Sequence, residues 1–256
     1  MDSKKFELVL NDTLNVVDVK DGTNAKLYRI RALRNVGMAR KGDLGGYIEH
    51  EGNLSQEGEA WVGEKARVYG NALVDGNALV TDSAIVKAWA HVGGGATIYD
   101  YVTVSGNGRV LERAFLSGHA SVCDNADVFG FARVTDHAII GGTAQVGGKT
   151  IVSGNAKVYG GILSGDAQVR GMASIARGAG IISSHGDIIT FDGLGGDHEA
   201  LSAYRTQGGG VELNCGAFTG TANVFREWVE SRFAEQQKTV WQLLGVANLI
   251  EHHFSN

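Results

Sequence analysis

Residues 60–98 read AWVGEKARVYGNALVDGNALVTDSAIVKAWAHVGGGATI and contain the pattern that decides the fold. An alanine recurs at every sixth position, and Val, Ile or Leu stands two residues after each alanine. The series continues to Val158, with only Val102, Gly108 and Thr150 in place of the alanine and no exception at the aliphatic positions. A six-residue period this regular is typical of a β-helix.

Each six-residue unit encodes a short strand followed by a turn. The alanine and the aliphatic residue lie two apart, so both side chains point to one face of the strand. Pairs such as Gly70-Asn71 and Asp124-Asn125 then favour a tight turn. Because so short a strand buries nothing alone, the units must stack. We therefore predict a mainly β protein in which residues 59–184 form a parallel β-helix, with three units or about 18 residues per coil.

Three of these units carry a family resemblance. VGEKAR, VYGNAL and VDGNAL, which begin at Val62, Val68 and Val74, resemble the hexapeptide motif of the acyltransferase superfamily. The resemblance implies a left-handed β-helix and a homotrimer, as is usual in that superfamily. It is specific for the fold and says little about activity, because the same fold hosts enzymes and inert scaffolds.

The segments that flank the repeat resemble a narrower group. Residues 27–62, LYRIRALRNVGMARKGDLGGYIEHEGNLSQEGEAWV, and residues 211–230, VELNCGAFTGTANVFREWVE, are similar to segments of hexapeptide-repeat proteins from phages and prophages. Proteins of this group are generally described without a known activity. The resemblance therefore implies a phage or prophage protein and little about its chemistry.

Residues 1–58 precede the repeat and predict a small β cap, since the open end of a β-helix is an unpaired edge. The stretches with strand-like patterns are 6–10, 27–35 and 43–49. At the other end, the period slips by one residue after Val158 and resumes at Ala167. We expect a bulge or loop near residues 160–165 and the end of the solenoid near His185.

Residues 185–256 predict an α+β region. A hairpin is expected where residues 200–206 and 211–215 flank three consecutive glycines. A helix then follows Thr221, a suitable N-cap, and a second helix covers about residues 239–251. The side chains expected to face inward are Val224, Phe225, Trp228, Val229 and Phe233 in the first helix and Val240, Trp241, Leu244 and Ala247 in the second.

The composition excludes several classes of partner. The 256 residues carry a net charge of −5, which provides no basic surface for a phosphate backbone, so nucleic acid is an unexpected partner. Cys123 and Cys215 are too few for a disulfide framework and fit a reducing compartment. No apolar run has the length of a membrane span. We expect a cytoplasmic protein without a membrane contact, located in the host cytoplasm if a phage encodes it.

Outward-facing residues of the β-helix fall on three walls when they are assigned turn by turn. Wall A carries Trp61, Leu79, Thr97, Phe115, Arg133 and Ile151. Wall B carries Arg67, Ile85, Thr103, Ser121, Ile139 and Lys157. Wall C carries Leu73, His91, Arg109, Asp127 and Gln145, of which His91, Arg109 and Asp127 predict a ladder of charges.

Wall A is too apolar to face water as a continuous stripe. We expect it to be covered by a sister subunit in a homotrimer, with the C-terminal helices as the alternative cover. The residues expected at this interface are Trp61, Leu79, Phe115 and Ile151.

The corner between walls A and B holds the candidate ligand-binding residues. His119 and His137 lie one turn apart, so they should stack, with Tyr101 one turn earlier and Asp136 beside His137. The predicted ligand-binding set is Tyr101, His119, Asp136 and His137. In the alternative, structural interpretation, these residues only fill turn positions of a solvated corner.

The histidines at this corner raise two chemical hypotheses, acyl transfer and zinc binding. In an acyltransferase, His119 or His137 would act as the general base on a hydroxyl or amine, and acetyl-CoA or a related thioester would be the acyl donor. A zinc site of the gamma-class carbonic anhydrase type needs three histidines, and the paired histidines of that family are missing here. We therefore expect no metal, and no cofactor unless the acyltransferase alternative holds.

The function that follows is a non-catalytic, phage- or prophage-encoded β-helical binding protein. A counter-defence role fits this class, either through capture of a small nucleotide signal or through binding of a host defence protein. Two alternatives stay open, an acyltransferase and a structural component of the virion. The sequence leaves the ligand and the host target unnamed.

Overall fold

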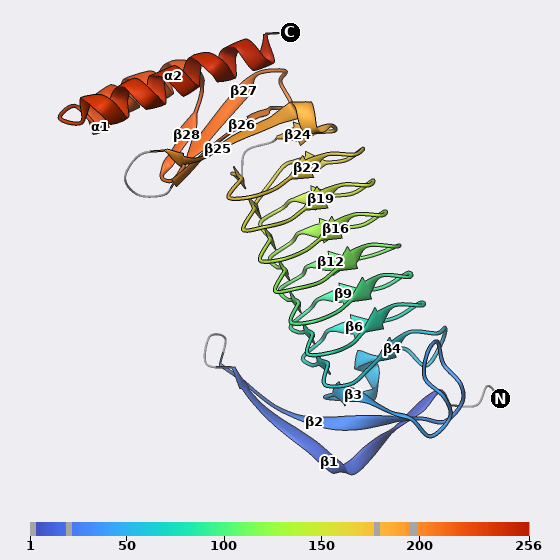
Figure 1. The fold of residues 1–256 in the computed structure, drawn as a ribbon. Helices are drawn as coiled ribbons and strands as arrows, with labels where there is room; N and C mark the ends of the chain where they lie inside the picture. Colours follow the sequence, from blue (N-terminus) through green and yellow to red (C-terminus); the bar gives the residue numbers. More distant parts are fainter. Residues whose placement is uncertain (1–3, 19–21, 177–179, 195–198, 256) are drawn as a thin grey trace.

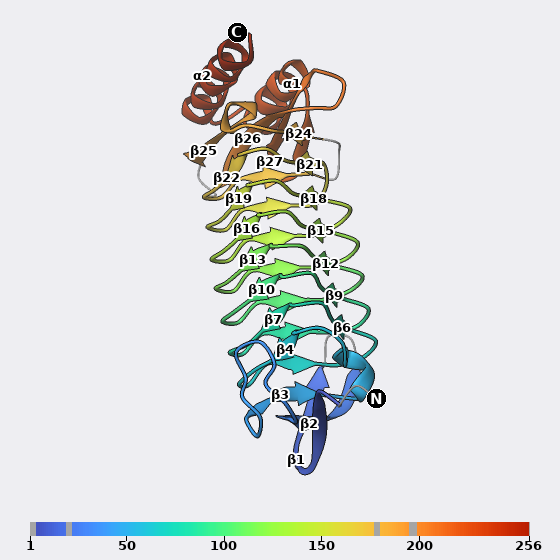
Figure 2. The ribbon, with the colours of Figure 1, turned by 90° about the vertical axis from the view of Figure 1, so that its right-hand side faces the viewer.

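The computed structural model describes residues 4–18, 22–176, 180–194 and 199–255. Its centre is a solenoid of two-residue strands joined by tight turns. A long hairpin lies at the N-terminal end of the solenoid, and a small sheet with two helices lies at the C-terminal end (Figure 1). Viewed from the side, the strands of each wall line up along the axis of the solenoid (Figure 2).

Three parallel sheets form the walls. Wall A consists of β4 (Trp61–Val62), β7 (Leu79–Val80), β10 (Thr97–Ile98), β13 (Phe115–Leu116), β16 (Arg133–Val134), β19 (Ile151–Val152) and β22 (Gln168–Val169). Wall B contains β3 (Leu44–Ile48), β5 (Arg67–Val68), β8 (Ile85–Val86), β11 (Thr103–Val104), β14 (Ser121–Val122), β17 (Ile139–Ile140), β20 (Lys157–Val158) and β23 (Ser174–Ile175). Wall C consists of β6 (Leu73–Val74), β9 (His91–Val92), β12 (Arg109–Val110), β15 (Asp127–Val128), β18 (Gln145–Val146), β21 (Ile162–Leu163) and β24 (Ile181–Ile182).

The interior of the solenoid is filled by the repeated alanine and aliphatic side chains. Leu116 and Ile140, for example, are 0% exposed, and the repeated alanines from Ala60 to Ala156 are at most 1% exposed. Along wall A, Thr97 pairs with Phe115, which is one turn of 18 residues further on. The structure thus confirms the predicted fold class, a mainly β protein with a parallel β-helix, an N-terminal β cap and an α+β C-terminal region.

The predicted slip in the repeat is also confirmed. Lys157 pairs with Ser174, one residue short of a full turn, because β21 begins five residues after β20 begins rather than six. The lost residue lies in the turn between Val158 and Ile162. The parallel pairing continues across it, since Ile162 still pairs with Gln145 in wall C.

Acidic residues at several turns adopt a positive φ that side chains rarely take. Asp100 has φ 56° and Asp136 has φ 61°. Each carboxylate accepts a hydrogen bond from the backbone N–H of the turn one coil further on: Gly118 donates to Asp100 over 2.8 Å, and Gly154 donates to Asp136 over 2.8 Å. A charge-assisted bond of this kind offsets the strain of the left-handed conformation.

The N-terminal cap extends wall B. The hairpin of β1 (Phe6–Asp18) and β2 (Thr23–Ala32) is antiparallel, and β2 pairs with β3. β3 in turn pairs in parallel with β5 of the solenoid, so ten strands form one continuous sheet in the described residues. The predicted β cap is therefore present, although β1 is longer than the strand expected over 6–10. A short 3-10 turn, Glu51–Asn53, precedes the first coil.

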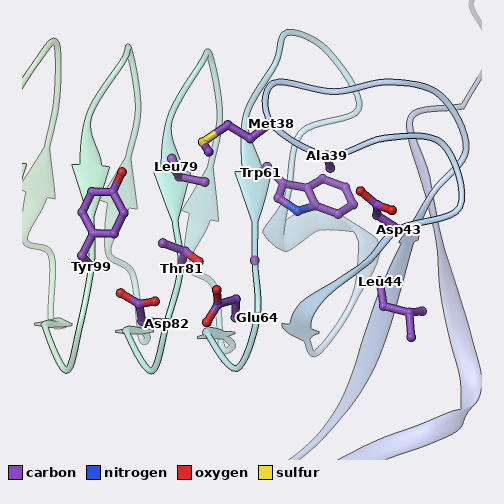
Figure 3. A pocket seen from close by; sticks show the side chains of 11 residues that line it. Met38, Ala39, Asp43, Leu44, Trp61, Glu64, Leu79, Thr81, Asp82 and Tyr99 are labelled. Atoms are coloured by element: carbon purple, nitrogen blue, oxygen red, sulfur yellow. The ribbon is translucent and has the colours of Figure 1, made fainter.

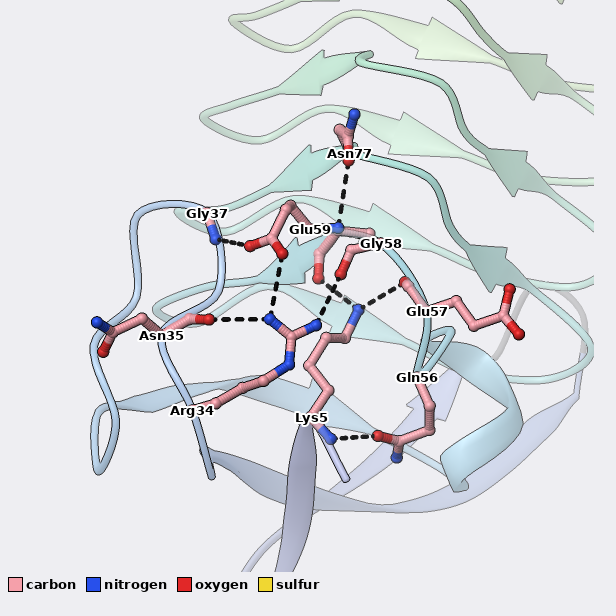
Figure 4. A network of polar contacts seen from close by, with 10 residues as sticks. Lys5, Arg34, Asn35, Gly37, Gln56, Glu57, Gly58, Glu59 and Asn77 are labelled. Atoms are coloured by element: carbon pink, nitrogen blue, oxygen red, sulfur yellow. Dashed lines mark hydrogen bonds and ion pairs between the residues drawn. The ribbon is translucent and has the colours of Figure 1, made fainter. Parts of the chain in front are cut away.

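The first coil presents unpaired carbonyl groups to the cap, because the carbonyl groups before and at the end of each strand accept from the preceding coil, as Ala78 O does from Trp61 and Val80 O does from Gly63, and the first coil has no predecessor. Lys5, which is 0% exposed, donates from Nζ to Ala60 O over 2.9 Å (Figure 4). Asn53 donates to Ala72 O over 2.8 Å, and the backbone N–H of Tyr47 donates to Ala66 O over 2.8 Å. At least one donor from the cap thus serves each wall. Burial lowers the pKa of Lys5 to about 8, with a smaller contribution from nearby Arg34.

The C-terminal region is a four-stranded antiparallel sheet with two helices packed on it. Its strands and helices are β25 (Ile188–Leu194), β26 (Glu199–Arg205), β27 (Val211–Cys215), β28 (Phe218–Gly220), α1 (Ala222–Arg232) and α2 (Gln237–Phe254), after a 3-10 turn at His185–Asp187. The β26–β27 hairpin and the helix after Thr221 confirm the predictions. β25 and β28, the outer strands of this sheet, were not predicted.

Two side chains predicted to face inward from the helices are exposed. Trp241 is 79% exposed and Val224 is 51% exposed, so both predictions are wrong. The buried face of α2 is formed by Leu243, Val246, Ala247 and Ile250. The second helix is apolar on more than one side, and the position of the sheet decides which side is covered.

Candidate functional site

Turns at the corner between walls A and B stack into a column. Its side chains, one per coil, come from Lys65, Ser83, Tyr101, His119 and His137. Backbone bonds fix the spacing: Tyr101 N–H donates to Gly118 O over 2.9 Å, and His119 N–H donates to Asp136 O over 2.6 Å. The column therefore inherits the rise of the solenoid, about 4.8 Å per coil.

Tyr101, His119 and His137 form a stack of aromatic rings. The ring centroids of Tyr101 and His119 are 4.9 Å apart at 6°, and those of His119 and His137 are 5.0 Å apart at 1°. All three side chains are exposed. The structure thus brings together three of the four residues predicted to bind a ligand, on one face of the molecule.

The fourth residue, Asp136, is directed elsewhere. Its Oδ2 accepts hydrogen bonds from the backbone N–H of Gly154, over 2.8 Å, and from the Thr135 hydroxyl, over 3.5 Å. Because the carboxylate serves the turn one coil further on, it does not orient the imidazole of His137. The corner offers a flat aromatic surface rather than a hydrogen-bonded carboxylate–histidine pair.

Wall A has a partly covered lower end. Trp61 is 5% exposed within the single chain, because the segment of residues 36–44 lies over its ring (Figure 3). Beside it is an open cavity of about 370 Å³. Its apolar lining comes from Met38, Leu44, Trp61 and Leu79, and its acidic lining from Asp43, Glu64 and Asp82.

The other residues predicted at a subunit interface keep an accessible apolar surface. Leu79, Phe115 and Ile151 are half-buried on wall A. Arg133 crosses the stripe, with its guanidinium 4.7 Å from the centroid of the Phe115 ring. The cover of wall A by a sister subunit stays a prediction.

Wall C carries one ion pair and one histidine–carboxylate contact, which follow the predicted ladder only in part. Arg109 makes a two-pronged contact with Asp127, through Nε to Oδ1 at 2.6 Å and through its second nitrogen to Oδ2 at 2.5 Å. His91 instead contacts Asp75 of the preceding coil, at 3.0 Å. These pairs join neighbouring coils on an exposed face.

A cationic pocket on wall B was missed from the sequence. It has a volume of about 350 Å³ and is lined by Leu14, Arg29, Tyr47, Lys65, Arg67 and Ser83. Arg29 of β2 pairs with Tyr47 of β3, and Tyr47 pairs with Arg67 of β5, so three adjacent strands bring these side chains together. The six-residue period predicts only the last of these neighbours, because β2 and β3 lie outside the repeat.

Within the described ranges, no cluster of three or more His, Cys, Asp or Glu side chains has a geometry suited to a metal ion. None of the helices in those ranges combines the length and the apolar character needed to cross a membrane. No protein-family model matches the chain, and no curated protein sequence matches it.

Proposed function

We propose that this protein is a non-catalytic β-helical binding protein, encoded by a phage or prophage, that holds its ligand at the corner between walls A and B. The observation that carries the proposal is the stack of Tyr101, His119 and His137. Backbone bonds between coils fix the turns that carry these rings, and the rings stack on one another before any ligand arrives, which lowers the conformational entropy lost on binding.

Support for binding rather than catalysis comes from Asp136. A histidine base is usually oriented by a hydrogen-bonded carboxylate or carbonyl group, and the Asp136 carboxylate is bonded to Gly154 instead. Both histidines also lie exposed to water, whereas a catalytic base generally acts in a site from which water is excluded.

The proposal includes a homotrimer built on wall A. Leu79, Phe115 and Ile151 form a half-buried apolar stripe along the solenoid, and burial against a sister subunit would remove this stripe from water. The stacked rings stand at the edge of the same wall, so three subunits would place them beside the subunit clefts. The counter-defence role, with a nucleotide signal or a host defence protein as partner, rests on the phage resemblance of residues 27–62 and 211–230.

The test is a native mass spectrum of the protein purified from its own host. We expect three subunits with a bound small molecule or host protein, and we expect Tyr101→Ala with His119→Ala to lose that partner while the subunits stay assembled. Trp89→Ala, which removes a ring that is 66% exposed at another corner, serves as the matched control. A monomer that carries no partner would contradict the proposal.

Two outcomes would replace the proposal with an alternative function. Acetyl-CoA binding in calorimetry, together with acyl transfer that His137→Ala or His119→Ala abolishes, would establish an acyltransferase. Recovery of the protein in purified phage particles would establish a virion component.

A further inference from the structure

The pocket on wall B concentrates positive charge in a protein with a net charge of −5. Arg29, Lys65 and Arg67 all line it. Lys65 is exposed and Arg67 is half-buried, and neither makes an ion pair with any described residue. Because these two cations share one cavity without a carboxylate partner, their charge is uncompensated and attracts an anion.

Arg29 is the least available of the three cations. It lies over the Tyr47 ring at 5.2 Å, and its Nε donates to Gly45 O over 2.8 Å. The Tyr47 hydroxyl in turn donates to Asp12 over 3.2 Å. This network holds the floor of the pocket in place and leaves Lys65 and Arg67 as the donors for an anion.

The cationic pocket lies next to the aromatic stack, and Ser83 links the two. Ser83 lines the pocket and also stands one coil before Tyr101 in the corner column. His119 covers one face of the Tyr101 ring, whereas the small side chain of Ser83 leaves the other face open, and Tyr101 is 62% exposed. A planar ring could stack on Tyr101 above Ser83, with an attached anionic group one coil lower, beside Lys65 and Arg67.

The acidic residues near this corner are directed away from the pocket. Glu64 and Asp82 line the cavity on wall A, on the other side of the corner. Asp82 accepts from the backbone N–H of Asp100 over 2.9 Å, and Asp100 accepts from Gly118 over 2.8 Å, so both carboxylates are already bonded to the turn one coil further on. The corner thus separates an acidic surface from a cationic one.

We propose that this pocket and the open face of Tyr101 together bind a nucleoside phosphate. Lys65 and Arg67 hold the phosphate through charge-assisted hydrogen bonds, and the base stacks on Tyr101. This inference rests on the proposed function of a binding protein, and it adds the class of ligand and the residues that recognise each part of it. A phosphate without a base, or a nucleoside without a phosphate, would engage only half of the site.

The test is calorimetric titration of the full-length protein with AMP, with adenosine and inorganic phosphate as half-ligands. Arg67→Gln is expected to weaken AMP about tenfold, as expected for the loss of a charged hydrogen bond. Tyr101→Ala is expected to weaken it by about fivefold or more, the usual effect of a lost base–aromatic stack. Each half-ligand should bind more weakly than AMP. Of the two half-ligands, the binding of phosphate should depend on Arg67 and that of adenosine should not.

Matched controls remove the same chemistry elsewhere on the solenoid. Lys157→Gln removes an exposed cation from the far end of wall B, and Trp89→Ala removes an exposed ring from another corner; both should bind AMP within about twofold of the unchanged protein. A second titration with coenzyme A, which also carries an adenosine phosphate, shows whether a free nucleotide or a larger nucleotide-bearing cofactor is the source. Binding of either ligand that depends on both Arg67 and Tyr101 supports the site.

Absence of binding by both ligands, or binding that both variants leave unchanged, would overturn the inference. The native mass spectrum separates this failure from that of the proposed function. A trimer that carries a different partner would leave the proposed function standing while the nucleotide site falls. A monomer that carries no partner and binds neither AMP nor coenzyme A would contradict both.

Discussion

The two ends of the solenoid are capped by opposite hydrogen-bonding groups, donors at one end and acceptors at the other, whereas the coils in the middle need no cap. At the N-terminal end the first coil presents carbonyl groups, and Lys5, Asn53 and the backbone of Tyr47 supply donors. At the C-terminal end the last coil presents N–H groups, and acceptors come from β26: Ser202 Oγ accepts from Ser174, at 2.9 Å, and the Tyr204 hydroxyl accepts from Ala176, at 3.1 Å. In the middle, each coil pairs with the next.

The difference follows from the polarity of parallel strands. The N–H of the first residue of each strand and that of the residue after the strand donate to the next coil, as Trp61 does to Ala78 O and Gly63 to Val80 O, so most unpaired acceptors collect at the N-terminal end and most unpaired donors at the other. Stability should therefore depend on apolar packing in the middle and on a few buried polar side chains at the ends.

The largest effect is expected in the middle of the solenoid. Leu116→Ala removes a side chain that is 0% exposed and should lower the free energy of unfolding by about 2–5 kcal/mol, through lost burial and a cavity that the rigid coils cannot close. Chemical denaturation measures the change. Trp241→Ala, at a side chain that is 79% exposed, is the control and should cost less than about 0.5 kcal/mol. Equal losses would contradict the contrast.

A smaller effect is expected from Asn53 at the N-terminal end. Its amide donates to Ala72 O and Gly70 O, and its side-chain oxygen accepts from the backbone of His50, at 3.0 Å. Asn53→Ala leaves these groups unpaired and should cost about 2–3 kcal/mol, measured by denaturation. Asn125→Ala, which removes an exposed amide from a turn in the middle, should cost far less. A cost for Asn53→Ala as small as that of Asn125→Ala would show that the cap is dispensable.

Tyr204→Phe tests the C-terminal end by removing a single oxygen. The buried hydroxyl accepts from Ala176 and donates to Glu212 over 2.6 Å. Its loss should cost about 1–2 kcal/mol, because the N–H of Ala176 then lies unpaired while the ring still fills the same space. Hydrogen exchange should report faster exchange at Ala176 in particular. Unchanged stability together with unchanged protection at Ala176 would contradict a role of this hydroxyl in closing the C-terminal end.

The smallest effect is a pH dependence that Lys5 should add. Burial lowers its pKa from 10.5 to about 8, so between these values the unfolded chain binds the proton more readily than the folded protein. Stability should therefore rise as the pH rises from about 8 to 10.5, by on the order of 1 kcal/mol. The measurement compares unfolding free energies of the protein and Lys5→Met across this range. If the unchanged protein and Lys5→Met show the same pH dependence of stability, burial does not lower the pKa of Lys5.

The sequence predicted the solenoid well because each of its interactions repeats. A residue's partner is always one turn away, so the period alone placed Tyr101, His119 and His137 in one column, and it also located the slip after Val158. The direction of the Asp136 carboxylate could not be predicted in this way. It depends on the positive φ of its own turn and on the free N–H of Gly154, which are properties of the folded backbone.

Outside the repeat, local pattern identified elements but not their neighbours. The N-terminal cap was expected, yet the pairing of β2 and β3 that brings Arg29 beside Arg67 could not be read from spacing. The inward face of α2 was misplaced at Trp241, because an amphipathic pattern names an apolar side and only the packed sheet decides which apolar side is buried.

The amino-acid sequence by itself thus determined the β-helix, its three walls and the stacked corner, since Val and Ala at every sixth position leave one way to fill a narrow interior. The tertiary structure alone decided how the ends are closed, where the cationic pocket forms and which carboxylates are already bonded. The first two features join segments that no period relates, and the third depends on the positive φ of each turn, which exists only in the folded backbone.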